Sequence, residues 1–394
     1  MPHSFSTSAL WGFAMQTSAA FGLLLIAGNQ THQENYARAF ATDSRCRLIG
    51  LTDESNIPAR RRELNHALAD ELGIPYFADF EAAIRRDDVQ LVSICAEPER
   101  RLDLTIACAR AGKHLYLDKD PAPTVEAARQ IGAVVREAGV LSQAFSMVRT
   151  PAAQRAKAIV EFGELGELIG LHCDITFAKG LSGTADLSRP RIEQSRPTRF
   201  SFIESKREFL CVGYYAVVLM QWLTGRRFQT VDATTSNYFF AEHQRNDVED
   251  FATVLLSLDG GIEAAIVAGR CGWSSSRAFG QHDIRLIGTR GSVSIDANQP
   301  RLEVFSDSAA WQPPSHAHPD DPMGFWSSTQ KAGGVTAKSD WFAVGSAVRN
   351  DFAYFLDCLE SGRESDVPIG TAIHAVEVVH AVYESAATGA SVKI

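Results

Sequence analysis

Apolar runs and helical patterns alternate along the first part of the chain. Residues 21–27 form a continuous apolar run that ends at Gly28, which is typical of a central strand in a parallel sheet. Helical stretches, with apolar positions three and four residues apart, then alternate with short apolar runs up to about residue 145. This order predicts a doubly wound parallel sheet with helices on both faces.

The pattern changes after about residue 150. One helical stretch is followed by a long strand and a second helix. Several strand-like runs then follow without helices between them. Two of the links between these runs, DGG and GTRG, are hairpin-type turns. Residues 311–340 are loop-like, and two helices are expected at roughly residues 348–361 and 369–387. The predicted fold class is therefore α/β, with the parallel sheet followed by an α/β domain that contains an open, mostly antiparallel sheet.

Composition and charge narrow the function classes. The chain has 394 residues, of which 45% are hydrophobic and 22% charged, as in ordinary globular proteins of two or three domains. A net charge of -9 argues against a nucleic-acid surface and against an anionic membrane patch. No run of about 20 apolar residues predicts a membrane span. Seven scattered cysteines, none at CxxC spacing, favour a cytoplasmic protein without disulfides.

The turn after the first strand only partly matches a dinucleotide-binding turn. The G-x-G-x-x-G pattern needs three glycines, but here only Gly28 fits, and Gln30 and Gln33 take the other two places. Asp53 ends the next strand, where an acid accepts from a ribose 2′-hydroxyl and repels a 2′-phosphate. We therefore expect NAD rather than NADP. The alternatives are a domain that has lost its nucleotide, and an Asp53 that only stabilises a turn.

Lys119 lies between two acids at the end of the apolar run HLYL. Asp118 and Asp120 flank it, and Pro121 and Pro123 follow. In open α/β sheets, ligands bind just outside the carboxyl ends of the strands. The position therefore predicts that Lys119 contacts a cofactor or a substrate. The alternative is a loop lysine paired with its acidic neighbours.

Five segments of the chain follow one another in an order and at a spacing that match a known family. They are GKHLYLDKDPAPTVEAARQI, GELGELIGLHCD, DFATVLLSLDGGIEAAI, IRLIGTRGSVSID and AVEVVHAVYESAATGASVKI. Together they resemble the glucose-fructose oxidoreductase, inositol dehydrogenase and rhizopine-catabolism (Gfo/Idh/MocA) family over residues 21–394. We thus expect an N-terminal extension at 1–20, a dinucleotide-binding Rossmann domain at 21–147, and a substrate-binding and oligomerisation domain at 148–394. A secretory signal is a weaker interpretation of the extension, because no basic residue precedes Arg38.

The resemblance implies a catalytic role for Lys119 beside the nicotinamide and the substrate hydroxyl. Asp118 replaces the family's usual Glu, and Asp120 replaces its usual Pro, which would hold the lysine charged. The family's D-x-G-x-H-x-x-D pattern becomes CVGYYAVV, so that Tyr215 stands in place of the acid/base histidine. A tyrosine can pass a proton, especially when a cation lowers its pKa, so Lys119 and Tyr215 are the expected catalytic pair. The alternative is that Tyr215 only fills space.

The remaining expected site residues follow from the same resemblance. The cofactor-binding set is Gly28, Asn29, Gln30, Thr31, Asp53, Cys95, Ala96, Asp118 and Lys119. The substrate-binding set is Lys119, Arg149, Lys179, Lys206, Tyr214 and Tyr215. An arginine-rich stretch before Tyr215 suggests a binding site for an anionic group of the substrate. The alternative is that this stretch is a solvated loop. His316 and His318 with Asp320 and Asp321 lack further ligands nearby, so no metal is expected.

The function implied by the resemblance is hydride transfer between NAD and a secondary alcohol of a sugar, a polyol or a sugar derivative. A sugar-like small molecule is the expected partner, and a homodimer or homotetramer the expected assembly. One alternative is an enzyme that retains NAD through a transient oxidation and catalyses elimination, epimerisation or glycoside cleavage. Another is a non-catalytic relative, which the incomplete glycine turn and the missing histidine would suit.

Overall fold

The first sheet is parallel and doubly wound, as predicted. The computed structural model describes residues 20–28, 31–177, 182–200, 205–271, 280–296, 301–306, 339–343 and 350–394. The strands lie in the order β3-β2-β1-β4-β5-β6. They span Phe21–Ile26 (β1), Cys46–Thr52 (β2), Tyr76–Phe77 (β3), Leu91–Ile94 (β4), His114–Leu117 (β5) and Ser142–Ala144 (β6). The order reverses between β1 and β4, so the carboxyl ends of these strands flank a topological switch point.

Helices cover both faces of this sheet. They are α1 (Gln33–Ala41), α2 (Ala59–Leu72), α3 (Phe80–Ile84), α4 (Arg101–Arg110) and α5 (Val125–Ala138), with a short 3-10 helix at Pro98–Arg100. Residues 23–26 are 0% exposed, because β1 is apolar and buried on both sides. Alternate residues of β1 pack against α1 and α2 on one face and against α3, α4 and α5 on the other.

The second sheet is mixed and mostly antiparallel. Its strands lie in the order β14-β13-β12-β11-β7-β10-β9-β8-β15, and β7 and β10 form the parallel pair. They span Leu168–Phe177 (β7), Phe228–Ser236 (β8), Phe251–Leu258 (β9), Ile262–Arg270 (β10), Gly280–Gly288 (β11), Gly291–Asp296 (β12), Arg301–Ser306 (β13), Ser339–Ala343 (β14) and Val392–Lys393 (β15). The hairpins predicted at DGG and GTRG join β9 to β10 and β11 to β12.

Some predicted boundaries were wrong. The strand expected through Phe240 ends at Ser236, and a short helix α8 (Ala241–Arg245) follows. Residues 339–340, expected in a loop, begin β14, because they pair with β13. Most of the predicted loop lies outside the described residues, and so does Val348, where the next helix was expected to begin. That helix, α9, spans Asp351–Ser361.

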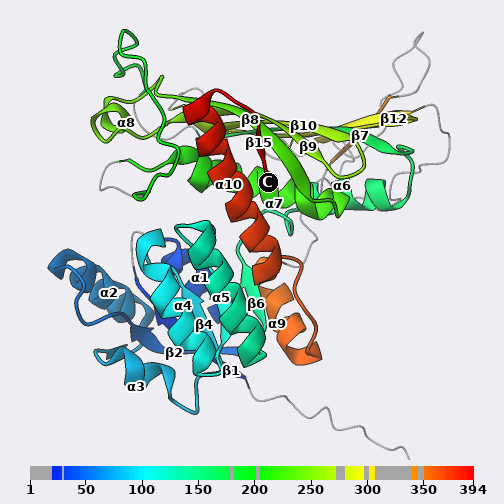
Figure 1. The fold of residues 1–394 in the computed structure, drawn as a ribbon. Coiled ribbons are helices and arrows are strands. Elements are labelled where there is room, and N and C mark those ends of the chain that lie inside the picture. The colour runs from blue at the N-terminus through cyan, green and yellow to red at the C-terminus, as the bar shows by residue number, and fades with distance from the viewer. Residues whose placement is uncertain are drawn as a thin grey trace, which may run out of the picture.

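The last helix ties the two sheets together. Helices α6 (Pro151–Glu161) and α7 (Tyr214–Thr224) lie against the second sheet, and α10 (Ile369–Thr388) packs against α5, α7 and β8 (Figure 1). One apolar core consequently runs from Leu24 in β1 through Val379 in α10 to Ile266 in β10. Among the described helices, α10 included, none has the length and apolarity needed to cross a bilayer.

Candidate active site

The ammonium of Lys119 is buried and faces Tyr215. Its Nζ lies 3.5 Å from Asp120 Oδ1 and 5.8 Å from the centre of the Tyr215 ring. Burial lowers the pKa of Lys119, but attraction to Cys211, Asp120 and Tyr215 outweighs burial and raises this pKa overall. Burial raises the pKa of the Cys211 thiol to about 11, so this thiol is neutral near pH 7, and Asp120 is the closest charged partner of Lys119. The lysine is therefore held as a cation inside the molecule.

Asp118 is a bonded anion behind Lys119. Its Oδ1 accepts a hydrogen bond from the Tyr36 hydroxyl at 2.7 Å and lies 2.8 Å from His32 Nδ1. Its Oδ2 accepts from Arg101 at 2.8 Å. Burial raises the pKa of Asp118, but His32 and Arg101 outweigh burial and hold it far below the usual range. Three side chains thus hold the Asp118 carboxylate, and with it the end of β5.

Arg101 shapes the turn that carries Lys119, and the sequence did not single it out. The guanidinium is buried and donates to the carbonyl oxygens of Lys119 and Asp120 and, at 2.7 Å, to that of Ala96. Asp120 has φ 50°, in the left-handed region. Its conformation differs from that of the proline which the family resemblance places here, because a proline ring fixes φ near about −65°.

Gly28 lets the first turn approach α2 closely. A Cβ at this position would lie 2.8 Å from the Cα of Asn65. The preceding residue, Ala27, has φ 64° in the left-handed region that favours glycine. The Thr31 hydroxyl closes the turn by donating to the Gly28 carbonyl at 2.7 Å. Asn29 and Gln30, both expected to bind the cofactor, lie outside the described residues.

Gln33 joins the ends of β1 and β4. Its Nε2 donates to the carbonyls of Ile26 at 3.0 Å and Ser93 at 2.8 Å, and its Oε1 accepts from the Ser93 hydroxyl at 2.6 Å. The thiol of Cys95 lies 3.4 Å from the same Oε1. The side chain is completely buried. In a dinucleotide-binding turn the third glycine stands at this position and lets the helix pack closely on the strand, whereas here the Gln33 amide bonds to the strand ends.

Asp53 follows the end of β2, as predicted, but its carboxylate already accepts hydrogen bonds from other side chains. Oδ1 accepts from Arg100 at 2.7 Å, and Oδ2 accepts from Asn65 at 2.8 Å. The side chain is 0% exposed. The predicted contact with a ribose therefore requires that Arg100 move or share this carboxylate.

Tyr215 forms one wall of a mostly apolar hollow between α7 and the second sheet. The hollow is small, because the space in it that the centre of a water molecule can occupy is about 10 Å³. It is lined by Met147, Thr150, Cys173, Ile175, Tyr215, Ala216, Leu219, His282 and Ile284. Lys119 lowers the pKa of Tyr215, as expected of a nearby cation, but burial outweighs this effect, so the pKa of Tyr215 lies above its ordinary value.

His282 is the residue of this hollow that the sequence analysis passed over. Its Nε2 is buried and has no hydrogen-bond partner among the described residues. The ring meets Phe177 edge to face, with 5.1 Å between ring centres. Burial lowers the pKa of His282, which keeps the imidazole neutral near pH 7. The signal in the sequence was a histidine within a strand that otherwise alternates apolar and polar residues.

The other expected substrate residues do not gather at one place. Arg149 donates to Asp366 at 3.0 Å and stacks over Tyr354. Tyr214 is fully buried, and its hydroxyl has no partner within the described part of the chain. Lys206 is exposed and interacts electrostatically with Asp120. Lys179 lies outside the described residues. Lys206 and Tyr214 thus both lie near Asp120, beside Lys119, whereas Arg149 is held by Asp366.

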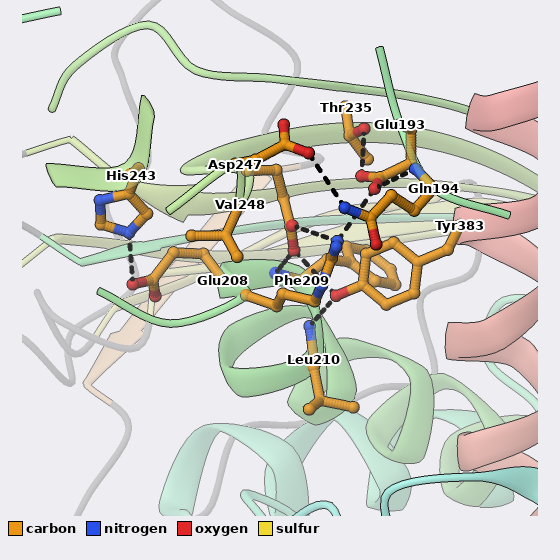
Figure 2. Close-up of polar contacts among 12 residues, drawn as sticks. Glu193, Gln194, Glu208, Phe209, Leu210, Thr235, His243, Asp247, Val248 and Tyr383 are labelled. Carbon is orange, nitrogen blue, oxygen red and sulfur yellow. Dashed lines mark hydrogen bonds and ion pairs between the residues drawn. The ribbon is translucent and has the colours of Figure 1, made fainter. Parts of the chain in front are cut away.

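A buried polar network supports the segment before Tyr215. Arg207 donates to Glu193 at 2.9 Å and Glu249 at 3.2 Å, and its side chain is 2% exposed, so for this arginine the solvated-loop alternative is wrong. Arg191, whose side chain is equally buried, pairs with Glu193 too. Figure 2 shows the Tyr383 hydroxyl at the backbone nitrogen of Leu210, 3.1 Å away. These contacts fix the start of a π-helix at Phe209–Gly213 that leads directly into α7.

Two family models match consecutive parts of the chain. One, described as the oxidoreductase family with an NAD-binding Rossmann fold, matches residues 24–145. The other, the GFO/IDH/MocA C-terminal domain, matches residues 153–294. The chain belongs to the GFO/IDH/MocA oxidoreductase family. The family resemblance stated from the sequence is confirmed, and so is the α/β fold with its two sheets.

Curated relatives of this GFO/IDH/MocA protein are named as dehydrogenases or reductases. The levoglucosan dehydrogenase of Pseudarthrobacter phenanthrenivorans is 30% identical over 23% of this chain and 24% of its own. The scyllo-inositol 2-dehydrogenase (NAD(+)) of Bacillus subtilis is 26% identical over 58% of this chain and 61% of its own. The chain thus spans less than two thirds of the length of either relative.

Solved structures share the fold across nearly the whole chain. An oxidoreductase domain protein from Kribbella flavida has a TM-score of 0.71 at 20% identity, covering 96% of this chain and 100% of its own. GenD2 from gentamicin A biosynthesis, solved in complex with NAD, has a TM-score of 0.68 at 20% identity, covering 96% of this chain and 97% of its own. At such identities the likeness concerns the fold alone.

Proposed function

We propose that this GFO/IDH/MocA protein is an NAD-dependent oxidoreductase that acts on a secondary alcohol of a sugar, a polyol or a sugar derivative. The observation that carries the proposal is the buried Lys119 ammonium beside the Tyr215 ring, at the carboxyl ends of the parallel strands. Ligands of open α/β sheets bind at this edge. The names of the curated relatives support the substrate class, since they include sugar and inositol dehydrogenases.

The residues present fit a dinucleotide. The switch point brings the ends of β1, β4 and β5 together, so that Gly28, Cys95 and Lys119 follow neighbouring strands. When bound, NAD would supply the hydride acceptor. Gly28 and Thr31 would hold it at the first turn, and Lys119 would lie at its reactive end. The catalytic and binding roles of all these residues remain proposals.

Two side chains would handle the substrate oxygen and its proton. The Lys119 ammonium would donate a hydrogen bond to the hydroxyl oxygen and stabilise the negative charge that develops as hydride leaves. Because the pKa of Tyr215 is raised, its hydroxyl stays protonated near pH 7. It would therefore accept the substrate proton while passing its own proton to water, rather than act as a phenolate base.

We also keep the predicted cytoplasmic location and the homodimer or homotetramer as proposals. Leu255 in β9 is 58% exposed and alternates with the buried Val254 and Leu256, so it lies on the open face of the second sheet, which suits a face covered by another copy. Light scattering coupled to size-exclusion chromatography would report the assembly. A monomer at micromolar concentrations would contradict this part of the proposal.

The first test is mass spectrometry of small molecules released from the purified, denatured protein. We expect NAD in the extract or, if the cofactor is lost during purification, binding of added NADH by calorimetry. A panel of polyols and sugars with NAD, followed at the absorbance of NADH, then tests turnover, which Lys119→Ala should abolish. Retained NAD without net NADH would support the transient-oxidation alternative, and cofactor binding without any turnover would support the non-catalytic one.

A further inference from the structure

Arg270 is the last residue of β10 and carries a partly exposed guanidinium. Its Nε lies 2.9 Å from Glu208 Oε1, and its side chain is 30% exposed. Ile266 and Ala268 come before it at alternate positions of the strand, and both are completely buried. Because side chains alternate between the faces of a strand, Arg270 lies on the inner face of the second sheet, as these core residues do. The π-helix that leads into α7 packs against β10.

Glu208 holds the Arg270 guanidinium on one side only. The ion pair is made through Nε, and within the part of the chain that the structure describes neither Nη nitrogen has an acceptor. The same Glu208 oxygen lies 3.1 Å from His243 Nε2, and Glu208 is 0% exposed. Glu242, a partly exposed acid near His243, pairs with Arg245 at 3.4 Å. The two Nη nitrogens of Arg270 therefore remain available as paired N–H donors for a ligand.

Cys211 connects this ion pair with Lys119. Glu208 comes immediately before the π-helix, and Cys211 is the third residue of that helix. Burial raises the pKa of the Cys211 thiol most, while the charge of Lys119 lowers it and the charge of Glu208 raises it. Both charged groups thus lie within electrostatic range of one thiol, and the pair of Arg270 and Glu208 borders the candidate site.

A second series of contacts leads from Arg270 to Tyr215. Arg270 pairs with Phe177 of the neighbouring strand β7. The Phe177 ring meets the ring of His282, and His282 and Tyr215 line the same hollow. The dinucleotide would bind at the first sheet, at the ends of β1, β4 and β5. Arg270 belongs to the second sheet, so it lies where a substrate rather than the cofactor would bind.

Two cations, Arg270 and Lys206, are exposed beside the buried acids of the site. Lys206 acts electrostatically on Asp120, whereas Arg270 pairs with Glu208. These two acids are shielded from solvent, since Asp120 is 2% and Glu208 0% exposed. The cations are thus the more accessible charges, and they attract an anion that enters the site.

A carboxylate fits these cations better than a phosphate does. The two Nη nitrogens of Arg270 match the two oxygens of a carboxylate in a bidentate contact. Glu208 already balances one of the two exposed cations, so the site can balance a single further negative charge. A phosphate monoester carries about −1.5 to −2 charges near pH 7, which exceeds that compensation.

We propose that Arg270 binds the carboxylate of the substrate and thereby selects acidic sugars, such as uronates, over neutral ones. Lys119 would hold the reacting hydroxyl of the same molecule, and Lys206 would strengthen the attraction of its charge. The inference rests on the proposed function, whose substrate class it narrows. Binding can be measured without turnover, so the inference and the proposed function can fail separately.

The test compares uronates with neutral sugars of the same stereochemistry on the full-length protein, with and without NADH. Glucuronate is paired with glucose, and galacturonate with galactose. Saturation-transfer nuclear magnetic resonance measures the dissociation constants, weak ones included. We expect at least one uronate to bind about tenfold or more tightly than its neutral partner. In Arg270→Gln this preference should fall to within about threefold, while the affinity for the neutral sugars changes by less than about threefold.

Two further variants make the test specific. Arg285→Gln is the matched control, because Arg285 is exposed in β11 between the buried Ile284 and Leu286 and so lies on the other face of the same sheet. It should leave the preference for uronates unchanged. Arg270→Lys keeps the charge beside Glu208 but loses the paired N–H donors, and should lower the preference by about threefold or more. It also provides the test if circular dichroism shows that Arg270→Gln does not fold.

Three outcomes would overturn the inference. The first is a wild type to which neither uronate binds more tightly than its neutral partner. The second is a preference for uronates that persists unchanged when Arg270 is replaced. The third is glucose 6-phosphate binding about tenfold or more tightly than either uronate, which would assign the cations to a phosphate.

The same measurements separate this inference from the proposed function. Oxidation of neutral sugars with NAD, without any preference for uronates, would keep the oxidoreductase and overturn the role of Arg270. Uronate binding that depends on Arg270, in a protein that never binds NADH, would keep the carboxylate site and overturn the oxidoreductase.

Discussion

At the scale of single residues, two neighbouring tyrosines have opposite surroundings. Tyr215 lines the hollow and faces the Lys119 ammonium, with 5.8 Å between Nζ and the ring centre. Tyr214 is completely buried, and its hydroxyl has no partner among the described residues. Of the two, Tyr215 is therefore the candidate for the proposed proton relay.

We predict that Tyr215→Phe lowers turnover by about 10²- to 10⁴-fold, the usual contribution of one general acid or base. The substitution removes the hydroxyl but keeps the ring beside Lys119, so NADH binding should stay within about twofold. Steady-state kinetics with the best substrate of the sugar panel, together with calorimetry, would measure both. Tyr238→Phe, at a position that is 48% exposed and outside the candidate site, is the control and should keep full turnover. Equal activity of wild type and Tyr215→Phe would mean that Tyr215 only fills space.

The sequence could place Lys119 but not the residues that hold it. An apolar run followed by prolines is a local pattern, and it correctly predicted the strand end that carries Lys119. Arg101 reaches Asp118 and Asp120 from the start of α4, and Arg100 reaches Asp53 from the end of the short 3-10 helix. Because adjacent arginines in one sequence stretch have such different partners, only the fold distinguishes them.

At the scale of elements, the π-helix before α7 is held by side chains from distant parts of the chain. The Tyr383 hydroxyl lies 3.1 Å from the Leu210 nitrogen and donates to Glu249 at 2.8 Å (Figure 2). Glu249 also accepts from the Phe209 nitrogen at 3.1 Å. Since this segment presents Cys211 and Tyr215 to Lys119, the network sets the geometry of the candidate site.

We predict that Tyr383→Phe lowers the free energy of unfolding by about 1–3 kcal/mol, because a buried N–H and a buried carboxylate each lose a partner. Urea denaturation would measure the change. Tyr214→Phe removes an equally buried hydroxyl that has no described partner, so its stability should change by less than about 0.5 kcal/mol. Similar losses in both variants would show that the hydrogen bonds of Tyr383 add nothing beyond packing.

Strands and long helices were predicted well, and irregular elements were not. Alternation of apolar runs with helical periods is a local signal, and the hairpin turns carry glycine pairs that sequence reasoning recognises. A π-helix has no such signal, since it depends on partners such as Glu249 and Tyr383, more than thirty residues away in the chain. Strand β15 has two residues and exists only because it pairs with β8.

At the scale of the whole molecule, α9 brings a buried acid against the first sheet. Asp351 accepts a hydrogen bond from the Tyr116 hydroxyl at 2.6 Å, and its other oxygen has no partner in the described structure. Burial raises the pKa of Asp351 to about 6. Between about pH 4 and pH 6 the unfolded carboxyl has therefore lost its proton, while the folded one keeps it.

We predict that this residue makes the protein less stable as the pH rises from about 4 to about 6, because over this range the unfolded carboxyl ionises while the buried folded one keeps its proton, and the loss is complete above about 6. Asp351→Asn removes this dependence and should raise the free energy of unfolding at pH 7 by about 1–3 kcal/mol. Urea denaturation across this pH range would measure it. Asp357→Asn, in the same helix but paired with Arg45 near the surface, is the control and should not raise the free energy of unfolding at pH 7. A less stable Asp351→Asn at pH 7 would contradict the prediction.

The left-handed backbone at Asp120 limits what can be engineered at the end of β5. A proline cannot take φ 50°, so exchanging Asp120 for proline would force this turn into another conformation. Arg101, which donates to the Lys119 and Asp120 carbonyls, holds the present conformation. A loop grafted here with a proline at this position would therefore need a change at Arg101 as well.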